Sequence, residues 1–437
     1  MSQTQYIMYE PVAPRRDRIP PIAVLAGLFI VGAVAFASLP GFNYVVKGTG
    51  VVLAAAYVFY AFRRRAHIAG EVYAYLAWFV WASMGALIAT VPELFWSAWQ
   101  TVFQIWFLIV ILSGFTENRR ILSYNLLMFL VAAFIGGGYS FLTGEYQRAE
   151  AEGVRVAGLI GSNGFGMIMV LATACMAYFW MQPSRLVRGL KYGLLIPGMA
   201  VAGVSVVLSG SRKSLLGLVL FYVAWLFFCY RKEVLRSGRT LLVIVLGLGV
   251  GGYGMYRVLS GSEIAKRMSR SWESVITGRH VTDSGSIRIE LYREAGRIIS
   301  ENPIMGVGLD HYRVFSPGHL VAHSEYAEIA ADTGLVGAAI YFLWYIFLWR
   351  RAGKIAKWSP DVTERRNAGL IRAVILVLLA LGFGAWFYSS KFAWVIMGSF
   401  IGYSNAVWGR IRSERAAGAY EYQSEYYLPA DALTEAQ

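Results

Sequence analysis

The residues that could do chemistry gather in one stretch of the chain, residues 260–324. Four of the five histidines lie there: His280, His311, His319 and His323. Histidine is the side chain whose unperturbed pKa lies nearest neutrality, so it suits proton transfer at physiological pH. A long segment rich in titratable groups, in a chain whose other connections are mostly short, is usually functional. If the chain catalyses a reaction, we expect this segment to carry it.

A metal site is the alternative use of these histidines. His311, His319 and His323 are close in sequence, but their spacing matches no common zinc pattern and no cysteine joins them. Both cysteines, Cys175 and Cys229, lie in apolar stretches, where core packing is expected rather than a disulfide or a thiol nucleophile. The sequence therefore predicts neither a metal nor another cofactor.

Two groups of basic residues are candidates for anion binding. The stretch from Ser209 to Ser214, SGSRKS, places Arg212 and Lys213 among small residues between two apolar stretches. Arginine presents a planar fork that matches phosphate oxygens. Residues 284–300 carry apolar side chains at helical spacing and predict an amphipathic helix. The simplest role of such a helix is to lie on a membrane surface with its charges solvated.

Membrane-spanning helices must position these residues. Of the 437 residues, 57% are hydrophobic and 15% are charged, which is too apolar for a soluble domain of this size. A transmembrane helix needs about 20 apolar residues, and such stretches recur along nearly the whole chain. We expect an all-α polytopic membrane protein with about twelve spans. The predicted spans are residues 21–39, 44–62, 72–91, 95–115, 121–142, 163–181, 191–209, 213–230, 240–259, 326–349, 369–389 and 391–408.

The basic residues predict the orientation of these spans. The formal net charge is +14, and most lysines and arginines lie in short clusters beside apolar stretches, such as Arg63-Arg64-Arg65 and Arg350-Arg351. With both termini in the cytoplasm, every even-numbered connection is basic, as the positive-inside rule requires. Residues 260–324 then form an outer loop. The same distribution argues against nucleic-acid binding, which needs a basic soluble face.

The chain divides into four predicted regions. Residues 1–259 hold transmembrane helices 1–9, and residues 260–324 form the large outer loop with its amphipathic helix. Residues 325–408 hold helices 10–12, and residues 409–437 form a cytoplasmic tail that we expect to be poorly ordered. No cleavable signal peptide is predicted, because the first apolar stretch has a full spanning length.

Several short motifs, taken together with their order along the chain, resemble those of the O-antigen ligase superfamily. The stretch from His323 to Gly337, HSEYAEIAADTGLVG, resembles its signature. The other motifs are Asn302 to Gly308 for an "NPxxGxG" element, Ser286-Ile287-Arg288 for a loop arginine motif, Ser209 to Arg212 for an "SGSR" element, and Gly161-Ser162-Asn163 for an asparagine-bearing entry to a span. The resemblance covers about residues 160–349.

The resemblance implies a GT-C-like membrane glycosyltransferase in the bacterial inner membrane. Its expected reaction moves a glycan from undecaprenyl diphosphate to an acceptor sugar hydroxyl at the periplasmic face, without metal or nucleotide. His323 stands at the position of the general base, and Arg212 and Arg288 stand at the two arginine positions that stabilise the diphosphate. Glu325 and Glu328 either orient His323 or only begin the next helix. Further candidates for substrate binding are Lys213, Arg297, His311, His319, Arg148 and Arg155.

Three functions compete on these grounds. An O-antigen ligase, with the sugar of lipid A-core as acceptor, is favoured. An O-antigen or exopolysaccharide polymerase would instead use a second lipid-linked glycan, and Arg297 with Gly308 makes an Arg-x10-Gly spacing like that described for polymerases. A twelve-helix transporter is the third candidate, but such proteins usually show related halves and ionisable residues at the midplane, and neither is visible.

Overall fold

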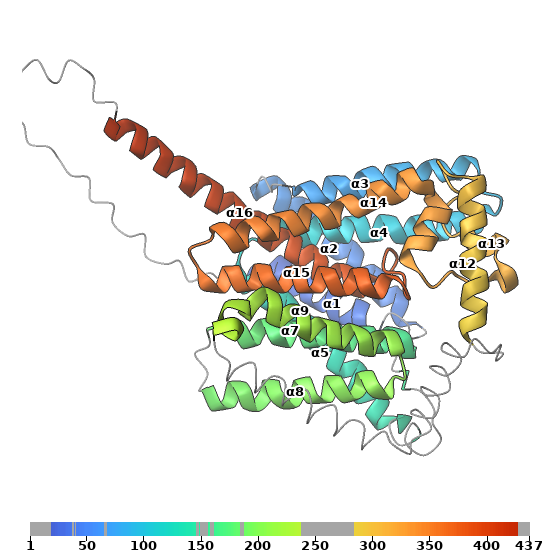
Figure 1. Cartoon of the computed structure of the whole chain (residues 1–437), viewed down its shortest axis with the longest axis horizontal. Coiled ribbons are helices and arrows are strands. Elements are labelled where there is room, and N and C mark those ends of the chain that lie inside the picture. Colours follow the sequence, from blue (N-terminus) through green and yellow to red (C-terminus); the bar gives the residue numbers. More distant parts are fainter. Residues whose placement is uncertain are drawn as a thin grey trace, which may run out of the picture.

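The described part of the chain is built from helices. The computed structural model describes residues 19–36, 39, 41–64, 68–145, 148, 156–157, 161–183, 188–236 and 284–426. Its longer helices are α1 Pro21–Val31, α2 Phe42–Arg64, α3 Gly70–Ser83, α4 Pro92–Phe115, α5 Arg119–Leu142, α7 Ser162–Met181, α8 Arg188–Leu208, α9 Arg212–Arg236, α12 Ser284–Glu301, α14 Glu325–Trp358, α15 Val362–Gly382 and α16 Lys391–Tyr426 (Figure 1). Short helical pieces are a π-helical turn Gly32–Phe36, the 3-10 turns Met84–Leu87 and Pro317–His319, and α13 Tyr312–Phe315.

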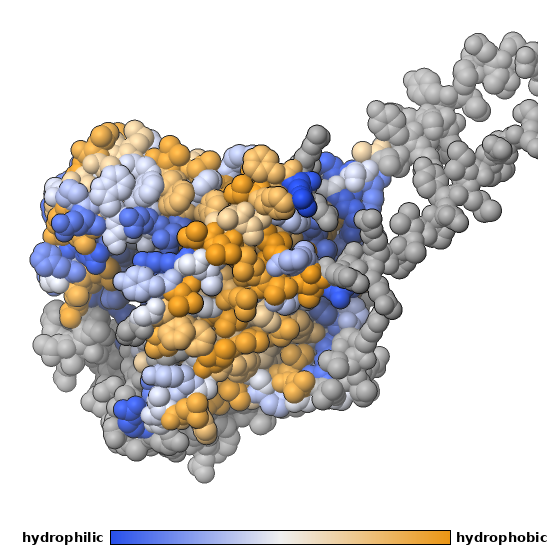
Figure 2. All heavy atoms as spheres, turned by 180° about the vertical axis from the view of Figure 1, so that it is seen from behind, coloured by the Kyte–Doolittle hydropathy of each residue, from blue (hydrophilic) through white to orange (hydrophobic). Residues whose placement is uncertain are grey.

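The helices form a membrane-spanning bundle. Seven of the described helices, α2, α4, α5, α7, α8, α9 and α14, are long and apolar enough to cross a membrane. An apolar band crosses the molecule between two hydrophilic ends (Figure 2). Large apolar side chains such as Val51 and Leu194 are 70% and 63% exposed, as lipid-facing residues are. The chain is therefore an all-α polytopic membrane protein.

The predicted spans agree with the described helices, with differences at their ends. The predicted span 240–259 and the first part of the predicted loop, residues 260–283, lie outside the described residues. α15 ends at Gly382, whereas the predicted span continued to residue 389. α16 continues through the predicted tail to Tyr426. Hydropathy alone cannot place these ends, because a helix continues past the membrane wherever its polar turns are stable.

α14 and α16 each pack against several other helices. α14 packs against α3, α15 and α16, while α16 also packs against α4 and α5. α9 packs against α15, and α7 joins α5, α8 and α9. Large side chains such as Trp78, Trp344 and Trp394 are fully buried among these helices. α14 and α16 are therefore fixed by close packing on several sides.

α12 lies across the ends of the other helices (Figure 1). It coincides with the predicted amphipathic helix: Leu291, Ala295 and Ile298 are at most 2% exposed, whereas Ile289 is 57% exposed. We call this side of the bundle the α12 end and the opposite side the basic end. The basic end carries Arg63, Arg119, Arg120, Arg350, Arg351, Arg410 and Arg412.

Candidate active site

A glycine interrupts α14 near its start. Gly334 has φ 72° and ψ 175°, a conformation that is essentially restricted to glycine. The loop before α14 docks on this break: the Leu335 N–H donates to the Pro303 carbonyl at 2.8 Å, and the Gly308 N–H donates to the Asp332 carbonyl at 2.9 Å. The helix break thus supplies backbone groups that hold the loop.

The Asp332 side chain completes this docking. Its two carboxylate oxygens accept from the Asp310 and Tyr312 N–H groups, each at 2.8 Å. The Tyr312 hydroxyl then donates to the Leu291 carbonyl of α12 at 2.7 Å. Two separate motifs of the resemblance, residues 302–308 and residues 333–337, therefore dock on each other. Together they form one structural unit that fixes the segment leading to α14.

Gly334→Ala is expected to break this unit. An added Cβ would lie 2.0 Å from the Ile304 carbonyl oxygen. With the unfavourable φ, we expect a loss of about 3 kcal/mol or more of folding free energy, seen as a lower thermal unfolding temperature in detergent. Gly136→Ala is the matched control, because Gly136 lies inside α5 with nothing within 4 Å of its added Cβ. Equal stability of the two variants would contradict the docking.

His323 lies at the end of the docked segment, directly before α14. Its φ of 55° is in the left-handed region, which is uncommon for residues other than glycine. The next residue, Ser324, caps α14 by accepting from the Ala327 N–H at 3.4 Å. The imidazole lies beside the Trp386 ring, with centroids 5.4 Å apart. Backbone, cap and ring contact together fix the direction of the side chain.

His323 lines a cleft of about 620 Å³, within the usual size range of ligand pockets. Residues 162–164 at the start of α7, Lys213 at the start of α9 and Lys391 at the start of α16 also line it. A helix N-terminus carries a partial positive charge and presents N–H donors. Because three helices begin at this cleft and α14 begins next to it, the site favours an anion.

Fixed cations strengthen this preference. The pKa of His323 is lowered from its usual value, first by burial and then by the positive charges of Lys213 and Arg288. Both cations therefore act on the imidazole, although they come from different helices. A lowered pKa keeps the ring neutral at pH 7, which is the form that a general base requires.

The α15–α16 loop, residues 383–390, ties these elements together. The Lys213 ammonium donates to the Gly384 carbonyl. The Tyr292 hydroxyl of α12 donates to the Phe383 carbonyl at 2.8 Å. Since Arg288 precedes Tyr292 by one helical turn, the same contact holds the arginine near the loop.

Glu325 fixes this loop and does not orient His323. Its buried carboxylate accepts from the Phe387 N–H at 2.6 Å and from the Tyr341 hydroxyl. Its own N–H donates to the Ala385 carbonyl at 3.0 Å. Glu325 therefore places the segment that carries Trp386, the ring beside His323.

Three predicted substrate-binding residues lie in other surroundings. His311 is fully buried; its Nε2 accepts from the Val91 N–H at 3.0 Å, and its Nδ1 lies 2.9 Å from the Leu309 carbonyl oxygen. These contacts make it a support of the docked loop. His319 is exposed, with Nδ1 near a main-chain carbonyl. Arg297 forms two ion pairs, at 2.5 and 2.7 Å, with glutamates of its own helix.

The remaining predictions are distributed as follows. Arg212 begins α9, but of the two neighbouring cations it is Lys213 that lines the cleft. Arg148 is exposed, and its guanidinium lies 3.4 Å from the Thr143 carbonyl. Arg155 and His280 lie outside the described residues. Within the described ranges, no group of three or more His, Cys, Asp or Glu side chains is placed to hold a metal ion.

Two residues of the site were missed from the sequence, Trp386 and Lys391. Both lie where the prediction had the end of one span and the start of the next. Lys391 lies at the end of the bundle opposite the basic clusters, where the positive-inside rule predicts few cations, and this was the available signal. Gly382 and Gly384 also indicated a turn rather than a continuing helix.

Comparison with known proteins gives two matches. Residues 197–342 match the family model described as O-Antigen ligase. An O-antigen ligase of Pseudomonas aeruginosa is 30% identical over 186 residues, which are 41% of this chain and 39% of that relative. The match therefore spans about two fifths of the length of the curated relative. The family-model match contains Lys213, Arg288, His323 and Gly334, and it ends before the α15–α16 loop.

Proposed function

Because the resemblance to the O-antigen ligase superfamily is confirmed over residues 197–342, we propose that this chain is an O-antigen ligase. It transfers a polysaccharide from undecaprenyl diphosphate to a sugar of lipid A-core, in the bacterial inner membrane. The α12 end faces the periplasm and both termini lie in the cytoplasm. One observation carries the proposal: a histidine and several fixed positive charges meet at one cleft at one end of the bundle.

The proposed reaction is a single displacement. An acceptor hydroxyl attacks the anomeric carbon of the glycan, and the bond from that carbon to the diphosphate oxygen breaks. His323 takes the hydroxyl proton. Lys213, Arg288 and the helix N-termini stabilise the negative charge that develops on the leaving diphosphate. Arg212 adds a charge at the same helix start. The step uses neither a nucleotide nor a metal ion.

An apolar groove beside the cleft suits the lipid part of such a donor. It has a volume of about 420 Å³ and lies between α1, α2 and α4, with Phe29, Phe103 and Phe107 in its wall. Lys391 lines both the groove and the cleft. A diphosphate at Lys391 would therefore leave its hydrocarbon chain along the groove. A soluble nucleotide-sugar donor would have no use for such a groove.

The alternatives differ in the acceptor or in the location of the polar groups. A polymerase would use the same donor chemistry with a second lipid-linked glycan as acceptor. Arg297, which made the polymerase-like spacing, is paired within α12 and does not line the cleft. A transporter needs its binding groups near the bilayer midplane, whereas the groups described above lie at the α12 end.

A lipopolysaccharide gel of a deletion strain tests the proposal. We expect a bare core with accumulation of lipid-linked polymer, reversed by the wild-type chain on a plasmid. A core that carries one repeat would instead assign the chain as a polymerase. An unchanged gel, with normal polymer on the core, would reject both enzymes.

The pH dependence of transfer provides a second test. Since only neutral His323 acts as a base and its pKa is lowered from 6.5, the rate should rise with pH and reach its plateau below neutrality. Lys213→Gln removes one charge that lowers this pKa, so the midpoint should move to higher pH. Lys213→Arg keeps the charge and should keep the midpoint. The readout is the pH–rate profile of purified protein, and a midpoint unaffected by Lys213→Gln would count against His323 as the base.

A further inference from the structure

A third pocket lies at the basic end, far from the cleft. Its volume is about 390 Å³, and it lies between α14 and α16. Its lining residues are Phe347, Arg350, Arg351, Lys354, Asn405, Trp408, Gly409 and Arg412. Four of these are cations, and no carboxylate is among them. The positive-inside rule accounts for cations at this end, but it does not account for a pocket lined with them.

One of the four cations forms an ion pair with a carboxylate. Arg351 pairs with Glu71 at 2.7 Å, and Glu71 is fully buried. Arg351 Nη1 and both Glu71 carboxylate oxygens are buried and have no hydrogen-bond partner among the described residues, so this ion pair is held by charge. The pair neutralises Arg351, whereas Arg350, Lys354 and Arg412 line the pocket without a carboxylate among its lining residues. Their charges would favour a bound oxygen anion.

The surface leading to the pocket is apolar. Leu343, Ile346 and Phe347 precede Arg350 on α14 and are 37%, 44% and 39% exposed. Hydrocarbon-facing side chains therefore run directly into the basic pocket. Trp408 lies at the same level, with the Lys354 ammonium 5.4 Å from its ring, a pairing typical of a membrane interface. This surface would match a phospholipid, whose acyl chains would lie on the apolar part and whose charged headgroup would lie in the basic pocket.

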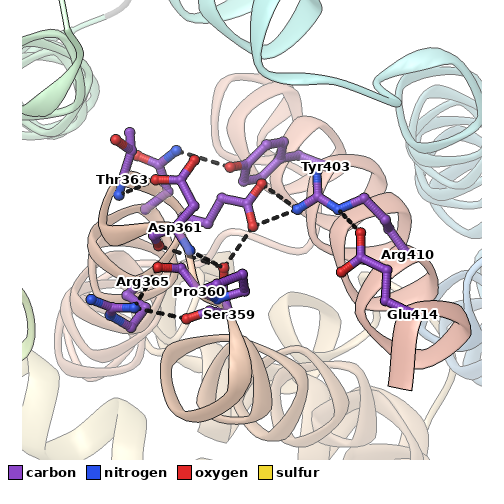
Figure 3. Close-up of polar contacts among 10 residues, drawn as sticks. Ser359, Pro360, Asp361, Thr363, Arg365, Tyr403, Arg410 and Glu414 are labelled. Atoms are coloured by element: carbon purple, nitrogen blue, oxygen red, sulfur yellow. Dashed lines mark hydrogen bonds and ion pairs between the residues drawn. The ribbon is translucent and has the colours of Figure 1, made fainter. Parts of the chain in front are cut away.

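A polar network at the basic end ties α16 to the start of α15 and to the turn between α14 and α15 (Figure 3). Arg410 of α16 donates to both carboxylate oxygens of Glu364, at 2.6 Å each. The Ser359 hydroxyl, in the turn between α14 and α15, donates to the same carboxylate at 2.7 Å. Arg410 lies between Trp408 and Arg412, two lining residues on α16. These contacts therefore hold the α16 wall of the pocket against the end of α14.

We propose that this pocket binds the phosphate headgroup of an anionic glycerophospholipid from the leaflet at the basic end. Basic pockets between transmembrane helices are suited to such headgroups. After the Arg351–Glu71 pair is set aside, three positive charges remain for the phosphate. The open apolar face of α14 favours a lipid over free phosphate, because acyl chains would cover it. The inference does not depend on the proposed transfer reaction.

The test is a titration of the purified full-length chain in neutral detergent, with bound lipid counted by native mass spectrometry. The ligands are phosphatidylglycerol, zwitterionic phosphatidylcholine and inorganic phosphate. The test variant combines Arg350→Gln, Lys354→Gln and Arg412→Gln. Arg351 is kept, because its loss would leave Glu71 buried and unpaired. The matched control removes three cations of the same end that do not line the pocket, with Arg63→Gln, Arg120→Gln and Lys357→Gln.

We expect wild type and control to bind phosphatidylglycerol equally, and the test variant to bind about a hundredfold more weakly. Arg412→Glu alone, on the exposed part of α16, should already weaken binding, so the result does not depend on folding of the triple variant. Equal binding by test and control variants would overturn the site. Equal binding of phosphatidylcholine would contradict selectivity for an anionic headgroup. Displacement of the lipid by inorganic phosphate at equal concentration would show that the pocket binds free phosphate and not a phospholipid.

Discussion

Replacing His323 with alanine should lower glycan transfer about 10²–10⁴-fold, the usual contribution of a general base. The imidazole lines the cleft, and its lowered pKa keeps it neutral and able to accept a proton at neutral pH. The measurement is the transfer rate of purified protein with a lipid-diphosphate donor at saturating concentration. The same variant should fail to restore polymer-bearing lipopolysaccharide in a deletion strain.

His323→Asn separates this chemistry from backbone effects. His323 has φ 55°, and asparagine tolerates the left-handed region much better than alanine does. The asparagine variant should therefore keep wild-type thermal stability while it loses transfer. A fully active, stable asparagine variant would show that the imidazole is not the base. Loss of stability in alanine alone would show that the backbone conformation also contributes.

The helices of this protein could be predicted from its sequence because the bilayer imposes a simple rule. A stretch must be apolar and about 20 residues long to span the hydrocarbon. α4, α5 and α7 follow this rule, and their ends agree with the predicted spans to within a few residues. α14 does not reveal its break, because Gly334 lies among residues that hydropathy treats as continuous helix. Only the structure shows that the loop before α14 forms hydrogen bonds with the backbone at this break.

The site could be predicted in part for a related reason. His323 lies in a loop whose titratable groups stand out against an apolar chain, and the resemblance marked its position. The sequence could not show which of Arg212 and Lys213 faces the cleft. Adjacent side chains on a helix point about 100° apart, and packing of the helix decides which of them faces a site. In the structure the SGS turn packs on α7 at Gly166, where an added Cβ would lie 2.7 Å from the Ser209 and Ser214 hydroxyls. With α9 packed in this way, Lys213 lines the cleft.

The role of the α15–α16 loop was not predictable from local patterns. Its hydrogen bonds with α9, α12 and α14 use main-chain carbonyls and the Phe387 N–H, and nearly any residue type supplies such groups. Sequence patterns report side chains, so a loop that works through its backbone leaves little trace. Lys391, at the start of α16, does leave a trace, since the positive-inside rule makes a cation at the end opposite the basic clusters unexpected.

Arg288→Ala should lower the transfer rate about 10²–10³-fold, as loss of one donor to a developing anion does. Arg288→Lys should recover only part of this loss, because an ammonium keeps the charge but not the two-pronged hydrogen bonding. Arg293→Ala is the matched control: Arg293 lies on α12 and is exposed, so its rate should stay within about twofold of wild type. If Arg288 acts on the leaving group, the loss persists at high pH, where His323 is neutral in every variant. If it acts only through the pKa of His323, the alanine variant differs from wild type in the pH midpoint alone, and wild-type rates on the plateau would remove Arg288 from diphosphate stabilisation.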